Sequence, residues 1–313
     1  MSAEIIDKKE DEKVDEEVGI LKKYDVSYKD FDILRKLGKG SFGEVYLVRF
    51  LKTGELFAMK ALSKRKKEDI NWMRYIMTER DVLVQCQSPF IAKLNFAFQT
   101  RTNMFLVLEF CTGYDLDKVL TFEKYFKEDR AKLYTAELIL AISALHQHDI
   151  IYRDLKPDNV VLDNLGHVKL IDFGMSKEGI ALSDQGARTF CGSVKYLAPE
   201  MLGKKGHGKS LDWYLIGVLF YEMLVGISPY YTSKKEDLFD NILYGKLKLP
   251  RSISSNARDL IMKLLNRSSK KRLGSQIPAV EKLIVYEDGQ VAEYEQKLVE
   301  QFPEIDLRRT GAL

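Results

Sequence analysis

Cysteine is scarce in this chain of 313 residues, which has three cysteines, four histidines and seven prolines. Cys86, Cys111 and Cys191 are odd in number and lack the spacing of metal ligands, and no secretory signal precedes them. The sequence therefore gives no disulfide framework, and we expect a cytoplasmic protein, with access to the nucleus left open. The histidines are scattered without a group of carboxylates or thiols, which argues against a zinc site.

Long hydrophobic runs and an excess of one charge are also missing. The longest apolar stretch, residues 211–228, contains Asp212 and Glu222 and is too short and too charged to span a bilayer, so we expect a buried core helix. The net charge is +3, which gives no reason to expect nucleic acid or an anionic membrane as a partner. With 45% hydrophobic residues, the chain can bury a large core, and its length allows one large domain or two lobes.

Two carboxylates, an amide and a lysine lie close together in the sequence between residues 148 and 174. Asp154 precedes Asn159 in YRDLKPDN, and Asp172 opens a DFG after the strand pattern HVKLI. Oxygen atoms of Asn159 and Asp172 suit magnesium, which is a hard cation. Asp154 is then available to orient a hydroxyl and accept its proton, and Lys156 to neutralise charge on a migrating phosphoryl group. The pattern predicts phosphoryl transfer.

YRDLKPDN followed by DFG resembles the catalytic loop of eukaryotic protein kinases, H-R-D-L-x-x-x-N. Tyr152 stands at the first position, and a tyrosine there is typical of the AGC group, which contains the cyclic-nucleotide-dependent kinases and protein kinase C. TFCGS followed by YLAPE matches the same group. The resemblance covers about residues 29–275 and implies an α+β, two-lobed kinase fold. Its small lobe, residues 29–110, is an antiparallel sheet with one main helix, and its larger lobe, residues 111–275, is helical.

A glycine-rich turn lies in FDILRKLGKGSFGEVYLVRF, whose alternation on both sides predicts a β-hairpin with Gly38, Gly40 and Gly43 at its tip. A lone G-x-G-x-x-G also occurs in dinucleotide-binding folds, between a strand and a helix. Here a second strand pattern follows, and the GK[ST] of a P-loop does not. The context therefore favours the kinase alternative.

The resemblance implies ATP and Mg²⁺ as cofactors and assigns the nucleotide site. Lys60, in the strand pattern LFAMKAL, corresponds to the lysine that holds the α and β phosphates, and Glu79, on a helix near residues 71–86, to its ion-pair partner. Leu108 is the expected gatekeeper. The full expected ATP-binding set is Leu37, Gly38, Gly40, Ser41, Phe42, Gly43, Val45, Ala58, Lys60, Glu79, Leu108, Glu109, Cys111, Asp115 and Val161.

The segment between DFG and APE is the expected activation segment. Thr189 is its expected phosphorylation site, because the phosphate would face Arg153 and Lys177. An upstream activating kinase is implied. Two structural pairings are also implied: Asp212 with the catalytic loop, and Glu200 with Arg272. A helix is expected over residues 129–147 to support that loop.

The family's catalytic loop for serine and threonine acceptors contains KPDN, so protein substrates with hydroxyl acceptors are implied. Asp115, Asp158 and Glu222 match positions that face the peptide, which favours basic residues before the acceptor. Each is equally explained as a solvated acid, and Asp115 could instead contact ribose. The rival function is a pseudokinase acting as a binding scaffold. It predicts a missing catalytic group, whereas the sequence retains them all: Lys60, Glu79, Asp154, Asn159 and Asp172.

Both ends depart from the family. Residues 1–17 carry eight acids and three lysines, so we predict a disordered charged arm over residues 1–28. Residues 276–313 form an atypical extension in which one helical stripe, Val291, Tyr294, Leu298 and Phe302, is expected to pack on the body of the protein. A sharper hypothesis is that Phe302, Ile305 and Asp306 dock on the small lobe. Otherwise, that lobe awaits a partner's tail.

Overall fold

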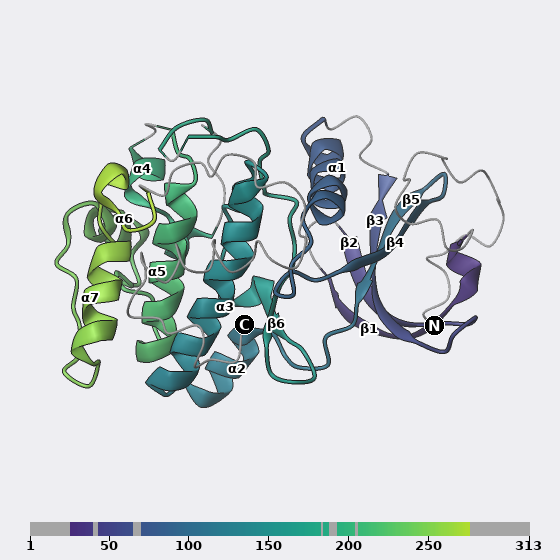
Figure 1. The fold of residues 1–313 in the computed structure, drawn as a ribbon, viewed down its shortest axis with the longest axis horizontal. Helices are drawn as coiled ribbons and strands as arrows, with labels where there is room; N and C mark the ends of the chain where they lie inside the picture. Colours follow the sequence, from purple (N-terminus) through teal and green to yellow (C-terminus); the bar gives the residue numbers. More distant parts are fainter. Residues whose placement is uncertain are drawn as a thin grey trace, which may run out of the picture. The chain divides into compact units, whose positions relative to one another are not determined.

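The computed structural model describes residues 26–39, 43–64, 70–182, 184–187, 193–203 and 206–275, without the side chains of residues 70, 71 and 235. Contacts divide the chain into two compact units (Figure 1). Unit 1 comprises residues up to 87 together with 92–111, and unit 2 comprises residues 88–91 together with those from 112 onward. Each unit is described by itself.

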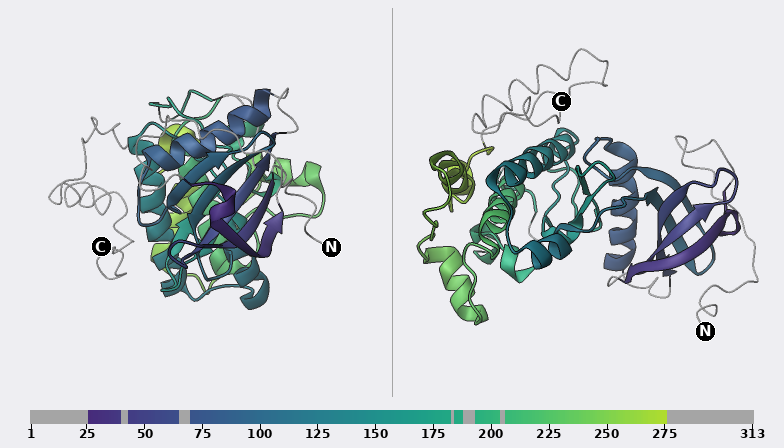
Figure 2. Two further views of the ribbon diagram at one scale, coloured as in Figure 1. Left: turned by 90° about the vertical axis from the view of Figure 1, so that its right-hand side faces the viewer. Right: turned by 90° about the horizontal axis from the view of Figure 1, so that it is seen from below.

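Unit 1 is a five-stranded antiparallel sheet with one long helix, as the small lobe was predicted to be. The strand order is β1-β2-β3-β5-β4. The helix α1 contacts β4 and is the blue helix beside the strands in Figure 2. The elements are η1 Tyr28–Asp30, β1 Phe31–Lys39, β2 Gly43–Phe50, β3 Leu56–Ser63, α1 Ile70–Gln85, β4 Leu94–Gln99 and β5 Asn103–Glu109.

Successive side chains along these strands point to opposite faces of the sheet. One face carries a buried aromatic cluster that includes Phe31, Phe50, Phe57 and Phe98, with ring centroids of Phe31 and Phe50 5.1 Å apart. Val26 belongs to the same cluster. The prediction that the disordered arm extends to residue 28 is therefore wrong, because Val26 is only 6% exposed. Composition did not reveal this, since the burial of Val26 depends on its packing against the strands. Residues 1–25 lie outside the described residues.

Unit 2 is mainly helical, with a short two-stranded sheet, β6 paired with β7. Its elements are α2 Leu116–Glu123, α3 Glu128–Gln147, η3 Pro157–Asn159, β6 Val160–Leu162, β7 Val168–Leu170, η4 Val194–Tyr196, α4 Pro199–Leu202, α5 Ser210–Val225, α6 Lys235–Tyr244, α7 Ser255–Leu264 and η5 Ser269–Lys271. The helices expected over residues 129–147 and within 211–228 are thus confirmed.

Helix α5 is the centre of unit 2 and packs against α3 and α7 (Figure 1). Apolar side chains occur on every side of this helix, and nearly the whole helix is buried. Gly217 allows the close approach of α7, because a Cβ there would lie 2.8 Å from that of Leu264. Buried in this helix, Asp212 is a charged group that needs partners. In the described part of the chain, no helix is both long enough and apolar enough to cross a membrane.

Candidate active site

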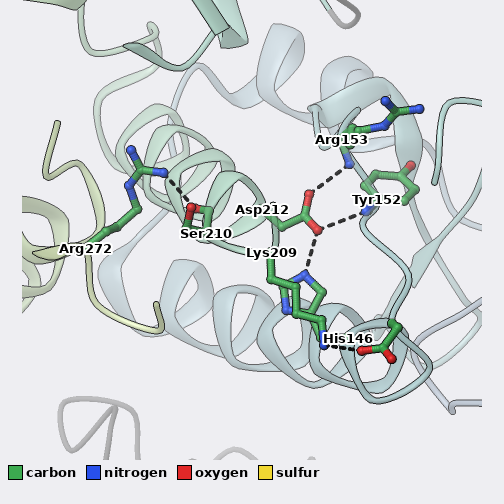
Figure 3. Close-up of polar contacts among 8 residues, drawn as sticks. His146, Tyr152, Arg153, Lys209, Ser210, Asp212 and Arg272 are labelled. Carbon is green, nitrogen blue, oxygen red and sulfur yellow. Dashed lines mark hydrogen bonds and ion pairs between the residues drawn. The ribbon is translucent and has the colours of Figure 1, made fainter. Parts of the chain in front are cut away.

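The buried carboxylate of Asp212 holds the catalytic loop from below, as the sequence predicted. Its Oδ2 accepts a hydrogen bond from the backbone N–H of Tyr152 at 2.9 Å, and its Oδ1 accepts one from that of Arg153 at 2.8 Å (Figure 3). Oδ2 also lies 2.7 Å from Nε2 of His146 on α3. Three polar partners converge on one carboxylate that is 0% exposed. The position of the loop is therefore fixed relative to both α3 and α5.

Arg153 adopts an unusual backbone conformation within this loop. Its φ is +71°, a region that residues other than glycine seldom occupy, at a cost of about 1–3 kcal/mol. The contact with Asp212 stabilises it, and so do two bonds from its side chain: Nε donates to the carbonyl oxygen of Met175 at 2.7 Å and Nη2 to that of Ser176 at 3.2 Å. The catalytic loop and the residues after DFG are thereby tied together.

Asp154 directly follows Arg153, whose N–H donates to Asp212, and is 8% exposed. Its Oδ2 accepts hydrogen bonds from Nζ of Lys156 at 2.8 Å and from Nδ2 of Asn159 at 2.9 Å. Burial raises the pKa of Asp154 above its usual value, and Lys156 offsets part of this increase. The three residues predicted from YRDLKPDN are thus assembled around one carboxylate, with the lysine beside the group expected to accept a proton.

Asn159 and Asp172, the predicted magnesium ligands, come from adjacent segments. The backbone N–H of Ile171 donates to the carbonyl oxygen of Asn159 at 3.0 Å, which places Asp172 next to it. The Asn159 amide nitrogen is turned toward Asp154, so its amide oxygen faces away from that carboxylate. One amide oxygen and one carboxylate suit a hard cation whose remaining ligands are phosphate and water. The donor set therefore fits magnesium bound together with a nucleotide.

Tyr152 occupies the position at which most kinases have histidine. Its hydroxyl donates to the carbonyl oxygen of Ile171 at 2.6 Å, and its ring meets that of Phe173 edge to face at 5.4 Å. Tyr152 therefore joins the catalytic loop to DFG.

In unit 1, Lys60 and Glu79 form the predicted ion pair. Nζ of Lys60 on β3 lies 2.6 and 2.7 Å from the two carboxylate oxygens of Glu79 on α1. The Glu79 side chain is 1% exposed, so its charge is stabilised by this partner rather than by water. Nζ also lies 5.5 Å from the ring centroid of Tyr75, which adds a cation–π contact.

Four residues of the expected ATP-binding set share a face of the sheet in unit 1. Val45 pairs with Lys60 across β2 and β3, and Ala58 pairs with Leu108 across β3 and β5. Residues that are directly opposite, or two apart on one strand, point to the same face. All four side chains therefore lie opposite the aromatic cluster, which contains Phe57 instead.

The predicted hairpin of β1 and β2 is confirmed by their antiparallel register, in which Gly38 pairs with Val45. Leu37 also lies on β1. Gly43 begins β2 at a point where a Cβ would lie only 2.1 Å from the Ala61 carbonyl oxygen, so a side chain is excluded. Gly40, Ser41 and Phe42 lie outside the described residues.

The hinge residues fall at the boundary of the two units. Glu109 ends β5, and its backbone N–H donates to the carbonyl oxygen of Lys93 at 2.9 Å, while Cys111 is the last residue of unit 1. In unit 2, Asp115 forms a bridge with Val161 of β6. Asp115 also caps α2 by accepting from the backbone N–H of Lys118 at 2.8 Å. Its role toward substrate or ribose stays a prediction.

A fourth acid, Asp117, interacts electrostatically with each of the three predicted substrate-facing acids. Burial raises the pKa of Asp117, and so do the charges of Asp158 and Asp115. Burial likewise raises the pKa of Glu222, whose carboxylate accepts a hydrogen bond from the Tyr196 hydroxyl. The sequence analysis did not include Asp117. Asp117 could have been included because it follows Asp115 by two residues, in the first turn of α2.

Glu200 and Arg272 form the predicted buried pair. Nη1 and Nη2 of Arg272 donate to the two carboxylate oxygens of Glu200 at 2.7 and 2.9 Å. Nη1 also donates to the Ser210 carbonyl oxygen at 2.8 Å, the bond that Figure 3 shows. This bidentate geometry is the strongest form of such a pair. It ties η5 to α4 and α5.

Two of the four histidines have carboxylate partners, which the sequence analysis did not anticipate. His146 contacts Asp212, and Nδ1 of His167 lies 2.5 Å from the buried Glu137. The burial of Glu137 could have been predicted from its position among the apolar residues of α3. Among the residues that the structure covers, no cluster of three or more such groups is placed to hold a metal.

Comparison with known proteins agrees with this geometry. The Protein kinase domain family matches residues 31–283. The chain is 43% identical over 248 residues to a RAC family serine/threonine-protein kinase homolog of Dictyostelium discoideum, covering 79% of this chain and 56% of the relative. It is 47% identical over 255 residues to serine/threonine-protein kinase sck2 of Schizosaccharomyces pombe, covering 79% and 39%.

Over 282 residues, the chain is 42% identical to ribosomal protein S6 kinase alpha-2 of Homo sapiens, covering 86% of this chain and 38% of the relative. The chain thus spans 56% of the length of the first of these relatives and less than 40% of the other two. The relatives confirm the resemblance to the AGC group. Since the family description covers most of the chain and the catalytic loop has the expected geometry, this chain belongs to the protein kinase family.

Proposed function

We propose that this protein transfers the γ-phosphoryl group of ATP to serine or threonine hydroxyls of protein substrates. The observation that carries the proposal is the buried carboxylate of Asp154, with Lys156 and Asn159 bonded to one of its oxygens. The names of the relatives support the serine/threonine class. Protein kinases use ATP and Mg²⁺, and the donors on Asn159 and Asp172 suit that pair of cofactors.

Bound MgATP supplies the phosphoryl group and neutralises part of its charge. Asp154 orients the acceptor hydroxyl and takes its proton as the new P–O bond forms, while the cation of Lys156 compensates the negative charge nearby. Lys60 contributes a further cation, kept in place by Glu79. Burial raises the pKa of Asp154, which makes it a better base than a solvated aspartate.

Replacement of Asp154 by Asn tests this activity. The amide cannot accept the proton, so we expect phosphorylation of a serine peptide to fall about 100- to 10,000-fold with unchanged Tm. Asp129→Asn on the exposed surface of α3 is the matched control and should retain full turnover. If Asp154→Asn and the parent show equal ATP-dependent labelling, the catalytic assignment is wrong. If the parent binds ATP but labels no polypeptide, a scaffold is the better description.

Substrates with basic residues before the acceptor are the expected preference. The acids Asp115, Asp117, Asp158 and Glu222 support this, because Lys118 and Lys195 offset only part of the repulsion that raises the pKa of Asp117, and a cationic substrate side chain would relieve more of it. An array of serine peptides with arginine, alanine or glutamate at each upstream position measures it. Equal rates for arginine and glutamate peptides would contradict the proposal.

Regulation by phosphorylation of Thr189, through an upstream kinase, is part of the same proposal. Thr189 lies outside the described residues, but Arg153 and Lys177 are described and lie on adjacent backbone segments, since residues 151 and 177 pair at 2.9 Å. If Thr189→Ala, with its fold intact, phosphorylates peptide as fast as the phosphorylated parent, this regulation is absent.

Docking of a tail on unit 1 is a separate proposal, supported by the sequence of residues 300–313. Phe302, Ile305, Asp306 and the helical stripe before them lie outside the described residues. Deletion of residues 300–313 should lower turnover if this tail docks in cis and leave it unchanged otherwise, in which case a partner's tail added in trans should raise turnover.

A cytoplasmic location, with nuclear access left open, also stays a proposal. Cys86 is a buried thiol whose pKa is raised to about 12 by burial, which fits a reducing compartment. Imaging of a tagged full-length protein would test it, and a secreted protein would contradict it.

A further inference from the structure

Glu137 is a buried acid on α3 that contacts the segment leading to DFG. It is 0% exposed and uses both carboxylate oxygens. Oε2 accepts a hydrogen bond from the backbone N–H of Val168 at 2.9 Å, and Oε1 lies 2.5 Å from Nδ1 of His167. Burial raises the pKa of Glu137, and these two contacts offset part of the increase. Because a buried acid is costly unless it is paired, this two-point contact holds the segment specifically against α3.

Val168 begins β7 in the β6–β7 hairpin, whose two ends lead to the proposed magnesium ligands. The register pairs Val168 with Leu162, next to the turn. At the other end of the hairpin, Asn159 comes directly before β6, and Asp172 follows β7 by two residues. Four residues of extended chain span about 13 Å, so Glu137 contacts the hairpin about this far from the proposed metal ligand.

The turn between the two strands is fixed by its own hydrogen bonds. Oδ1 of Asp163 accepts from the backbone N–H groups of Leu165 at 2.9 Å and His167 at 3.0 Å. The N–H of Asp163 donates to the carbonyl oxygen of His167 at 2.9 Å. Gly166 has a φ of +89°, a conformation that glycine adopts without strain. A well-ordered backbone therefore presents the imidazole of His167 to Glu137, and the hairpin moves as one piece.

The other end of the hairpin is bonded to the residues after the catalytic loop. The N–H of Ile171 donates to the carbonyl oxygen of Asn159 at 3.0 Å, and that of Leu170 donates to the carbonyl oxygen of Phe90 at 2.8 Å. Asp172 has a φ of +62°, which costs about 1–3 kcal/mol and persists only where the surroundings hold it. A hairpin that tilted on α3 would therefore displace Asp172 or let its backbone relax.

We propose that Glu137 and His167 are positioning residues for the proposed magnesium site: by fixing the β6–β7 hairpin on α3, they set the place of Asp172. This rests on the proposed function, in which Asp172 and Asn159 bind the metal of MgATP. Helix α3 also holds the catalytic loop, through His146 near its C-terminal end. One helix therefore sets the positions of both the proposed base and the proposed metal ligand.

Calorimetric titration of the full chain with AMP-PNP, a non-hydrolysable ATP analogue, tests the proposal without relying on turnover. Affinity is measured in EDTA and at increasing Mg²⁺ concentrations. Glu137→Leu removes both contacts at similar side-chain volume. We expect the Mg²⁺ concentration that gives half of the metal-dependent gain in affinity to rise about tenfold, as for loss of an outer-shell partner, while the affinity in EDTA stays unchanged. Asp129→Leu, on the exposed surface of α3, is the matched control and should match the parent.

Two milder variants separate positioning from overall stability. In Glu137→Gln, the amide oxygen can accept from the N–H of Val168 while its NH₂ group donates to Nδ1 of a neutral His167, so both contacts persist. Its Mg²⁺ requirement should stay close to that of the parent. His167→Leu keeps only the bond to Val168, so its requirement should rise about threefold, half of the full effect on a logarithmic scale. The His167 side chain is 33% exposed, so this variant serves even if Glu137→Leu folds poorly.

The parent and the variants answer separate questions. If the parent binds AMP-PNP in a Mg²⁺-dependent manner but labels no peptide, the proposed transfer reaction fails while the positioning role is still decided by the variants. If folded Glu137→Leu or His167→Leu has a lowered Tm but the Mg²⁺ requirement of the parent, the contact only stabilises the fold and this inference is overturned. It is likewise overturned if Glu137→Gln is as impaired as Glu137→Leu, because the bonded geometry is then not what matters.

Discussion

Replacing Asp212 by Asn is the most direct perturbation of the catalytic loop, because it changes one charge without changing the volume of the side chain. Asp212 accepts from two backbone N–H groups, those of Tyr152 and Arg153, through different oxygens (Figure 3). An amide has only one accepting oxygen. Whichever way it turns, one of the two N–H groups will face an NH₂ group instead of an acceptor.

The magnitude follows from these contacts. A buried donor that loses its acceptor costs about 1–3 kcal/mol, and the remaining bond loses its charge assistance, worth about 1 kcal/mol more. His146, 2.7 Å from Oδ2, loses its carboxylate partner as well. We therefore expect a loss of about 3 kcal/mol in the free energy of unfolding, which corresponds to a fall in Tm of about 6–12 °C.

We expect the Asp212→Asn variant to lose turnover even under conditions in which it remains folded. Arg153 has a φ of +71° that the bond to Asp212 helps to maintain, and Asp154 is the next residue. A shift of the catalytic carboxylate by about 1 Å costs about 100-fold in rate, so we expect kcat to drop by this order even at temperatures where the variant is folded.

Calorimetry, hydrogen exchange at the amides of Tyr152 and Arg153, and a peptide phosphorylation assay measure these effects. Asp259→Asn is the matched control: Asp259 pairs with Lys263 at 2.6 Å on the surface of α7, and its loss should cost less than about 0.5 kcal/mol. If Asp212→Asn behaves like this control, with Tm and kcat unchanged, the carboxylate does not hold the loop and the reasoning fails.

Three further predictions concern other charged groups. Arg272→Met should lower the free energy of unfolding by about 3–5 kcal/mol in calorimetry, because it leaves Glu200 buried without its partner, and adding Glu200→Gln should recover part of the loss; equal stability of parent and single variant would refute this. Lys60→Met should reduce kcat/KM for ATP at least about 100-fold, with Glu79→Gln showing a smaller loss; an unchanged value would show that the ion pair does not serve nucleotide binding. Burial lowers the pKa of His207 from 6.5 to about 4 in the native protein, so the unfolded chain binds more protons in that window and the stability of the unphosphorylated protein should decrease by about 3 kcal/mol as the pH drops from 6.5 to 4. His207→Gln should flatten this part of the stability curve, and a curve parallel to the parent's would contradict the assignment.

Local patterns predicted several of the elements, and resemblance of short motifs supplied the candidate catalytic residues. Alternation around Gly38 and Gly43 predicted the hairpin of β1 and β2, and a helix with apolar residues on every side predicted the burial of α5. Asp154, Asn159 and the ion pair of Lys60 were predicted by resemblance of short motifs, which place chemically required groups at fixed spacing.

The tertiary structure decided which distant groups meet. Val26 is buried although it follows a highly charged segment of the sequence, because most of its partners lie on strands farther along the chain. His146 and Asp212 are 66 residues apart, and nothing local indicates that they touch. The same holds for the placement of His207 beside Arg153. A sequence determines its periodicity and its chemical groups, whereas the burial that makes a charge costly, and the partner that stabilises it, depend on packing between segments that only the folded chain brings together.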